Sequence, residues 1–378
     1  MDSKANIDYV EIVPFYPVSV IKNEDYFLLP AQVMKEREFN ASIFTYYYPN
    51  LPKVCKVDGI TISSFLNSLD LFKHIQNNSL VHCHGFTRRM LFIYLLLIIT
   101  GKKCIKILTP HTSFGIKLPY GLKFKVHKFL RFVFNSFDAI ITTNAFEQEF
   151  YLKNDFKKVY KIPLAVDVDF FLKIRNNDFK DKFFREKFGI KEGTFNLIFL
   201  GGVRNEKNPS TVIVAFNLLK HEYGDAKLFI VGCSDQSAES KLRKLISKNY
   251  SSDVFFIQRL DPYSDIYNDI FKAGNIFINS SPVEGFCLGA YEAAACGLGL
   301  CLSDIGSFTS VFKNSALFHH PNDSLKLKDN LLKYIRDKGF LRRHIDLNTI
   351  IVKSCDPVHV KDLLAKIYLE QIEKREKL

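Results

Sequence analysis

Apolar segments and amphipathic stretches alternate along the first half of the chain. The segments that read as strands lie at 9–16, 41–48, 79–86, 104–111, 139–144 and 159–166. The stretches with helical spacing lie at 30–39, 64–76, 87–100 and 120–136. Alternation of this kind is typical of parallel strands that are joined by crossover helices.

A charged and polar stretch at 167–193 interrupts this pattern and predicts a bridge between two domains. The pattern then restarts, with strands expected at 195–202, 226–232, 254–258, 275–281 and 298–304. Helices are expected at 209–223, 237–249, 264–273 and from 288 onward. The prediction is therefore a Rossmann-like domain at 1–166, the bridge, a second such domain at 194–360 and a terminal amphipathic helix at 361–378. In such doubly wound folds ligands bind at the carboxyl ends of the strands, here in a cleft that the two domains face.

The composition fits a globular protein of two domains. The chain has 378 residues, of which 47% are hydrophobic and 24% are charged. None of its eight cysteines forms a C-x-x-C pair, so a structural zinc site is not expected. The start of the chain lacks an apolar leader, and the longest apolar run, MLFIYLLLII, is too short for a bilayer. We therefore expect free thiols in a reducing cytoplasm.

The net charge of +12 is unevenly distributed. No Asp or Glu lies between Asp70 and Asp138, and the basic residues of this region are densest in YGLKFKVHKFLRFVF, residues 120–134. Apolar residues alternate with the lysines here, so the basic segment 102–131 can contact an anionic membrane surface through the helix expected at 120–136. The alternative is a solvated basic face packed on its own domain. Nucleic acid is not favoured as a partner, because no recognition motif accompanies the charge.

Two glutamates, Glu284 and Glu292, lie in SPVEGFCLGAYEAAACG, where an expected strand turns into a helix. The first turn of that helix, near Leu288, offers backbone N–H groups and a positive dipole end to a phosphate oxygen, and Gly289 allows a close approach. Glu292 can accept hydrogen bonds from two vicinal hydroxyls, as on a ribose. Glu284 can contact a sugar or stabilise positive charge at its anomeric carbon. The alternative is that both acids only complement the helix dipole.

This segment resembles the E-x7-E motif of the family 4 retaining glycosyltransferases, which have the GT-B fold of two Rossmann-like domains. The family segment commonly reads E-G-F-G-x-x-x-x-E-A-x-A-x-G, and this chain departs from it by a cysteine at the second glycine. The resemblance implies one role for each matched position: Glu284 as a catalytic residue, Glu292 for the donor ribose, Gly285 and Phe286 for the donor sugar, and Cys287, Leu288 and Gly289 for the donor diphosphate.

A second stretch, FLGGVRNEKNPSTVIVAF, resembles the strand, loop and helix with which the family binds the donor diphosphate through an arginine and a lysine. Lys207 takes the lysine position. The arginine usually stands five residues earlier, where this chain has Gly202, and Arg204 can reach the diphosphate by another route. The resemblance implies a diphosphate site at Gly202, Arg204 and Lys207.

Histidines in the first half also fit the family. LVHCHGF and ILTPHTSFG resemble strand ends at which the family keeps histidines. His111 fits the residue that contacts the transferred sugar, and the alternative is a capped loop histidine. His82 and His84 flank Cys83 without a third ligand, so no metal is expected.

The function that the resemblance implies is transfer of a sugar from a nucleotide diphosphate sugar to an acceptor hydroxyl with retention of configuration. No metal and no cofactor besides the donor substrate are expected. The basic first half adds the expectation of a lipid-linked acceptor, as in assembly of lipopolysaccharide or another surface polysaccharide, and of a cytoplasmic protein peripheral to the membrane. Two alternatives remain: another nucleotide-sugar enzyme of this fold, such as an epimerase, and a non-catalytic partner that kept the fold.

Overall fold

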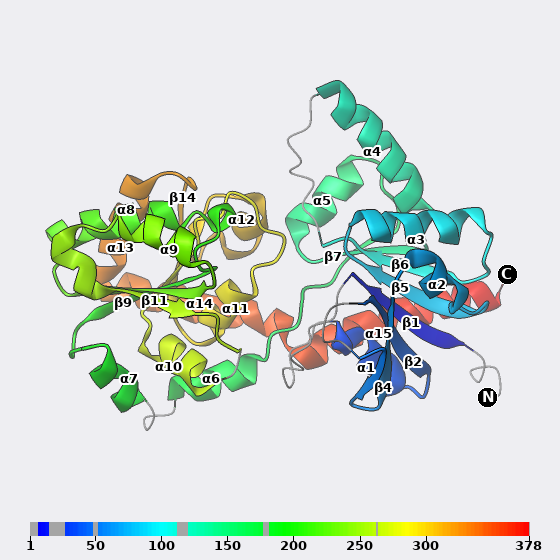
Figure 1. Cartoon of the computed structure of the whole chain (residues 1–378), viewed down its shortest axis with the longest axis horizontal. Coiled ribbons are helices and arrows are strands. Elements are labelled where there is room, and N and C mark those ends of the chain that lie inside the picture. The colour runs from blue at the N-terminus through cyan, green and yellow to red at the C-terminus, as the bar shows by residue number, and fades with distance from the viewer. Residues whose placement is uncertain are drawn as a thin grey trace. The chain divides into compact units, whose positions relative to one another are not determined.

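The computed structural model describes residues 7–14, 27–47, 52–111, 120–176, 181–261 and 264–377; the side chains of 120–127, 176 and 181–183 lie outside the described part. The chain forms two compact units, each of which is an α/β fold around its own sheet (Figure 1). The first unit comprises Met1–Ala165 and Pro357–Leu378, and the second comprises Val166–Asp356.

The first unit has an eight-stranded sheet in the order β3-β4-β2-β1-β5-β6-β7-β8. Neighbouring strands are parallel except β3 and β4, which form an antiparallel pair at one edge. The strands are β1 (Asp8–Val13), β2 (Asn40–Tyr46), β3 (Val54–Val57), β4 (Ile60–Phe65), β5 (Ser79–His84), β6 (Ile105–Thr109), β7 (Ala139–Thr142) and β8 (Val159–Lys161). The six strands expected from the apolar pattern are confirmed, and β3 and β4 are additional.

Helices cover both faces of this sheet. One face packs on α1 and α15, and the other packs on α2, α3, α4 and α5. The alternation of side chains in a strand explains the two layers, since Tyr9 and Val13 of β1 join the first core while Val10 and Ile12 join the second. The helices are α1 (Leu28–Lys35), α2 (Ser68–Lys73), α3 (Arg88–Ile99), α4 (Tyr120–Asn135), α5 (Ala145–Lys153) and α15 (Pro357–Glu376).

The apolar run MLFIYLLLII lies in α3, which has 12 residues and buries Met90, Ile93 and Leu97 against the sheet. It is therefore a helix of the protein core, as its length predicts. Throughout the described ranges, no helix combines enough length with enough apolar character to cross a membrane.

The second unit has a six-stranded, fully parallel sheet in the order β11-β10-β9-β12-β13-β14. The strands are β9 (Phe195–Leu200), β10 (Ala226–Cys233), β11 (Val254–Gln258), β12 (Ile276–Ile278), β13 (Gly299–Ser303) and β14 (Leu317–His319). The strand order reverses between β9 and β12, which is the switch point of a Rossmann-like sheet. This strand order is that of the expected doubly wound fold.

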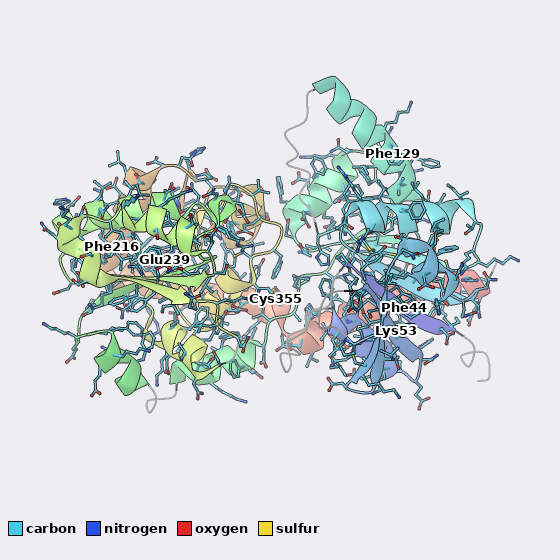
Figure 2. The ribbon with its side chains drawn as sticks, viewed as in Figure 1. Phe44, Lys53, Phe129, Phe216, Glu239 and Cys355 are labelled. Atoms are coloured by element: carbon cyan, nitrogen blue, oxygen red, sulfur yellow. The ribbon has the colours of Figure 1, made fainter. Side chains whose placement is uncertain are left out.

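Two helical layers cover this sheet as well. Ile198 of β9 joins a core with α6, α7, α10, α11 and α12, while Leu197 and Phe199 join a core with α8, α9 and α13. Phe216 of α8, which can be located in Figure 2, is fully buried in the second core. The helices are α6 (Val168–Asn176), α7 (Asp181–Lys187), α8 (Pro209–Glu222), α9 (Gln236–Arg243), α10 (Asp265–Ala273), α11 (Leu288–Ala295), α12 (Gly306–Phe312), α13 (Ser324–Arg336) and α14 (Lys338–Val352).

The boundaries of the compact units differ from the expected domain ranges. The stretch 167–193, expected as a bridge, contains α6 and α7, whose Phe171 and Phe184 are buried in a core of the second unit. Its phenylalanines are spaced among charges, so the stretch reads as polar in sequence although one helical face is buried. The terminal helix begins at Pro357, and its Leu364 and Tyr368 belong to the core of the first unit.

Two glycines hold the ends of β9 and β10 together. Gly202 has a positive φ of 63°, and a Cβ atom placed on it would lie 2.1 Å from the carbonyl oxygen of Gly232. The backbone N–H of Gly202 donates to the carbonyl oxygen of Val231 at 2.8 Å. A side chain at position 202 is therefore excluded by backbone atoms, which do not move aside as a flexible side chain does.

We expect Gly202→Ala to lower the free energy of unfolding by about 2–4 kcal/mol, because the new methyl group meets backbone atoms at a left-handed residue. The measurement is urea denaturation. Gly224→Ala is the matched control, since a methyl group at that position would have no atom within 4 Å of it, and its change should stay below about 1 kcal/mol. Equal losses in both variants would contradict the explanation.

Candidate active site

The residues predicted for the donor lie at the carboxyl ends of β9 and β12, the two strands that flank the switch point. Gly201 directly follows β9 and is succeeded by the short helix η2 (Asn205–Lys207). Asn279 directly follows β12, and α11 begins nine residues later, at Leu288. Loops at a switch point leave the sheet in opposite directions and open a crevice between them.

A partly buried ion pair joins these two loops. Lys207 Nζ lies 2.5 Å from Glu284 Oε1, and the exposed fractions of the two side chains are 19% and 8%. Asn279 Nδ2 donates to the same carboxylate oxygen at 3.2 Å. The side-chain oxygen of Asn279 accepts from the N–H of Ser281, which orients the amide. Two donors from different elements thus hold the Glu284 carboxylate in one position.

Glycine at position 201 makes the pair possible. A Cβ atom on Gly201 would lie 2.8 Å from Cγ of Lys207, so the stem of the lysine crosses the space that a side chain would occupy. Gly202 has the separate role described above, since its N–H is already bonded to Val231. Backbone packing therefore explains why a glycine is needed at position 202. Any contact of Gly202 with a diphosphate stays a prediction.

The absence of a side chain at Gly289 also has a packing reason. A Cβ atom there would lie 2.9 Å from Cδ1 of Leu200 and 3.5 Å from the ring of Phe277. A side chain at position 289 would point toward the strands. Its absence lets α11 approach β9 and β12 closely. Gly289 therefore has a packing reason of its own, and the expectation that its small size also admits a ligand to the first turn of α11 stays a prediction.

Cys287 is the N-cap residue of α11 and gives no side-chain cap to the helix. Burial, together with the nearby Glu284 carboxylate, raises the pKa of its thiol to about 12, so the sulfur stays protonated. Asn279 Nδ2 lies 3.5 Å from this sulfur. Phe286 stacks on Tyr291 with ring centroids 4.1 Å apart, which fixes the turn between Glu284 and the helix.

Glu292 lies one helical turn into α11 and is 5% exposed. Its Oε2 accepts a hydrogen bond of 2.5 Å from the hydroxyl of Tyr267 on α10. Burial raises the pKa of Glu292 to about 7, and the Tyr267 hydrogen bond acts in the opposite direction. A carboxyl group in this environment changes its protonation near neutral pH and is held by a single tyrosine.

Arg204 is not brought into this cluster. Its side chain is 57% exposed, its Nη1 lies 3.7 Å from Glu206, and its Nε donates to the carbonyl oxygen of Gly201 at 3.3 Å. Within the described residues, the cationic side chain that faces Glu284 is Lys207. A role of Arg204 toward a diphosphate requires its side chain to change partners.

The first unit carries a second, separate cluster of polar residues. His111 follows β6 with a positive φ of 52°, an uncommon conformation for a residue with a side chain. His84 of β5 lies between two partners: its Nδ1 is 2.9 Å from His111 Nε2, and its Nε2 is 3.0 Å from Glu11 Oε1. These residues form a chain of contacts from Glu11, which is fully buried in β1, to His111.

Burial keeps the histidines of this cluster neutral. It lowers the pKa of His111 to about 4 and holds that of His84 well below its ordinary value, so both rings are neutral at pH 7. A neutral imidazole has one donor and one acceptor nitrogen. In the contact between His84 Nδ1 and His111 Nε2, one nitrogen therefore donates and the other accepts.

His82 belongs to the same cluster but has other partners. Its Nε2 lies 2.8 Å from Thr109 Oγ1, and its Nδ1 lies 2.8 Å from the hydroxyl of Tyr368 on α15. Burial lowers the pKa of His82 to about 3. The two histidines that flank Cys83 are thus occupied by hydrogen bonds to the fold, and the small cavity that they line with His111 has a volume of about 30 Å³.

Sequence reasoning missed Glu11, Tyr267 and Asn279. The signal for Glu11 is a single acid within the apolar strand YVEIV, since a buried charge needs a partner. The signal for Asn279 is an amide at the carboxyl end of a predicted strand. Tyr267 left no signal, because its partner Glu292 lies 25 residues away on a different helix.

The two doubly wound sheets and the cluster at the switch point define a class of protein, and comparison with known families agrees with it. Residues 180–352, which lie within the second unit, match the family model described as "Glycosyl transferases group 1". This family match and the fold together support a glycosyltransferase of GT-B architecture, and the expected GT-B fold is confirmed. The match to a family 4 member in particular stays a prediction.

Similar proteins have been described in bacteria. Over 138 residues the chain is 30% identical to a D-inositol 3-phosphate glycosyltransferase of Pseudarthrobacter chlorophenolicus, covering 36% of this chain and 31% of that protein. Over 227 residues it is 26% identical to the UDP-Gal:alpha-D-GlcNAc-diphosphoundecaprenol alpha-1,3-galactosyltransferase of Escherichia coli. This match covers 57% of this chain and 55% of that protein. The matched segments thus span less than two thirds of either relative.

A solved structure shares the fold over nearly its whole length. Sucrose-phosphate synthase from Thermosynechococcus elongatus superimposes with a TM-score of 0.76 at 16% identity, covering 98% of this chain and 100% of that one. At this identity the likeness concerns the fold alone.

We expect the free energy of unfolding of the wild type to fall as the pH rises from 5 to 8. This decrease should be roughly 3 kcal/mol larger in the wild type than in Glu292→Gln. The pKa of Glu292 is raised to about 7 in the fold, so the folded state binds more protons than the unfolded state between pH 4.5 and 7, and stability falls as pH rises through this window. Urea denaturation at unit steps of pH measures the effect. The exposed Glu192→Gln is the control, and identical pH profiles of wild type and Glu292→Gln would contradict the prediction.

Proposed function

We propose that the chain is a retaining glycosyltransferase that transfers a sugar from a nucleotide diphosphate sugar to an acceptor hydroxyl. The observation that carries the proposal is the partly buried ion pair between Lys207 and Glu284. It joins the loops at the switch point, beside the N-terminus of α11, in the segment that matches the glycosyltransferase family. A diphosphate-linked sugar has an anionic part for the lysine and helix terminus, and a neutral sugar for the carboxylate.

In the proposed reaction the bond between the anomeric carbon and the diphosphate oxygen breaks, and its electron pair stays on the diphosphate. The acceptor oxygen forms a bond to the anomeric carbon, and the proton of the acceptor hydroxyl passes to the leaving diphosphate oxygen. Lys207 and the first turn of α11 stabilise the charge that gathers on the leaving diphosphate. Glu284, released from Lys207 and still held by Asn279, faces the positive charge that develops on the sugar.

The other predicted residues have supporting roles in this proposal. Glu292 accepts hydrogen bonds from the ribose hydroxyls, which favour its ionised form and lower its pKa from about 7. Gly285 and Phe286 contact the donor sugar from the turn. His111 forms a hydrogen bond with a hydroxyl group of the transferred sugar. Diphosphate contacts of Gly202, Arg204, Cys287, Leu288 and Gly289 complete the donor site.

Relatives support the proposed substrates. The name of the relative from Escherichia coli contains a UDP-sugar donor and a diphosphoundecaprenol acceptor, which is a lipid-linked glycan. The name of the relative from Pseudarthrobacter chlorophenolicus contains an inositol phosphate acceptor instead. We propose a lipid-linked acceptor at the inner face of a membrane, in assembly of lipopolysaccharide or another surface polysaccharide, because this chain also has a basic, partly apolar helix.

That helix is α4, and its described part supports a membrane contact. Phe129, marked in Figure 2, is 43% exposed and Phe132 is 64% exposed, next to the exposed Lys128. Arg131 is paired with Asp155 at 2.7 Å, which removes one cation from this face. The side chains of Lys123 and Lys125 lie outside the described residues. Exposed aromatic rings beside a lysine fit an anionic lipid surface.

We expect one of UDP, GDP, ADP and CMP to raise the melting temperature of the wild type, and Glu292→Gln to weaken its binding roughly tenfold or more. The physical reason is the loss of a charged acceptor for the ribose. Thermal-shift titrations measure the affinities, and Glu192→Gln is the control. No response to any nucleotide would contradict the donor site and favour a non-catalytic partner.

Turnover distinguishes a transferase from an epimerase in the same experiment. The substrate is the nucleotide sugar whose nucleotide raises the melting temperature. We expect it to release its nucleoside diphosphate only when an acceptor is present. Glu284→Gln should reduce the rate of this release about a hundredfold. Conversion of the donor without an acceptor would identify an epimerase instead.

We expect the double variant Phe129→Ser/Phe132→Ser to lose most of its binding to vesicles of phosphatidylglycerol and phosphatidylcholine. Each buried phenylalanine contributes about 1.5–3 kcal/mol when it enters an apolar phase. Cosedimentation measures the bound fraction. Phe146→Ser on α5, with an exposed fraction of 41%, is the matched control. Equal binding of wild type and double variant would exclude α4 as the contact.

A further inference from the structure

A cavity of the second unit lies at the amino-terminal ends of β9 and β12, whereas the Lys207–Glu284 pair lies beyond their carboxyl ends. Its volume is about 450 Å³, which is within the range of ligand pockets. Asn196, near the start of β9, and Asn275, directly before β12, line it. The ion pair lies beyond the carboxyl ends of the same two strands, so the cavity is separate from the proposed donor site.

The cavity is strongly cationic. Among the described residues that line it none is acidic, and four are basic: Arg185, Lys272, Lys338 and Arg342. The two arginines have partners, since Arg185 donates to the carbonyl oxygen of Lys191 and Arg342 forms an exposed ion pair with Asp346. The two lysines have no hydrogen-bond or ion-pair partner within the described part of the chain.

Helix α14 adds to the positive field at this place. Lys338 and Arg342 come from its first turns, and the helix has 15 residues. Its N-cap residue Asp337 bonds to the N–H of Phe340, which satisfies one of the terminal donors. The positive end of the dipole therefore lies at the side of the cavity where Lys338 is exposed.

Two buried polar atoms in the lining lack partners. Lys272 is a partly buried residue whose Nζ atom is buried without a hydrogen-bond partner. Asn196 is 1% exposed; its Nδ2 donates to the carbonyl oxygen of Ala273, while its Oδ1 has no donor. An unpaired buried ammonium and an unpaired amide oxygen each cost free energy. Together they favour a ligand that carries an anionic group and a hydrogen-bond donor.

We propose that this cavity binds a small phosphorylated molecule that also carries hydroxyl groups, of the chemical class of the sugar phosphates. The phosphate pairs with Lys272 and Lys338, and a hydroxyl group donates to Asn196 Oδ1. Lysine binds phosphate as a point charge and needs no fixed geometry. The site is independent of the proposed transferase activity, since it lies at the amino-terminal ends of the strands and its test needs no turnover.

A purely structural role for Lys272 would predict a different stability of the ligand-free variant Lys272→Met than a role in anion binding does. Lys272 lies in the last turn of α10, where a cation complements the helix dipole. If that were its role, Lys272→Met would destabilise the ligand-free protein. If the lysine instead serves to bind an anion, removing its unpaired charge leaves the ligand-free protein as stable as the wild type or more stable.

The test is isothermal titration with glucose 6-phosphate and, separately, thermal denaturation without ligand. We expect wild type to bind, and Lys272→Met and Lys338→Met each to weaken binding roughly tenfold or more. Lys248→Met, an exposed lysine of the same unit, and Lys207→Met in the donor cluster should bind as the wild type does. The melting temperature of ligand-free Lys272→Met should equal or exceed that of the wild type.

Three results would overturn the proposal: no binding of glucose 6-phosphate to the wild type, equal affinity of wild type and Lys338→Met, or loss of binding in Lys207→Met alone. The last result would place the phosphate in the donor cluster. A lower melting temperature of ligand-free Lys272→Met would assign this lysine to the helix terminus. Lys338 is exposed, so its variant keeps the binding test decisive even if Lys272→Met does not fold.

Discussion

The reversal of strand order between β9 and β12 is the constraint on which the second unit's site depends. Loops that follow these two parallel strands turn away from each other, so groups at their ends meet without a strand between them. Lys207 and Glu284 are 77 residues apart in sequence and 2.5 Å apart in space for this reason. The ion pair also needs Gly201, over which the lysine stem passes, and Asn279, which holds the carboxylate from the second strand.

Burial gives the acids and histidines of both units their properties. Glu292, enclosed between α11 and α10, has a pKa of about 7 and one tyrosine partner. His84 and His111 stay neutral because they are taken out of water, and their ring nitrogens lie 2.9 Å apart. A buried acid or histidine without a hydrogen-bond partner lowers the stability of the fold. The partner residues on neighbouring helices and strands are therefore part of the site.

Much of the fold was predictable because parallel α/β folds have strong local signals. Buried strands such as β9, β10 and β11 are short apolar runs, and the helices between them have apolar spacing. The antiparallel pair of β3 and β4 was missed, since β3 is a short, partly exposed edge strand and β4, ITISSF, contains three polar residues. Helices α6 and α7 were read as a bridge, because charges surround the few phenylalanines that enter the core. The motif around Glu284 and Glu292 indicated this region through its resemblance to a glycosyltransferase motif, and its role in donor binding stays a prediction.

The sequence by itself determined the two α/β halves, the place of the candidate donor site in the second half and the acids and lysine that belong to it. Local periodicity and short-range spacing carry that information. Only the tertiary structure decided that Lys207 pairs with Glu284, that Tyr267 holds Glu292, and that Gly202 and Gly289 are required by backbone and strand atoms. These contacts join residues far apart in the chain, and strand order and helix packing bring them together.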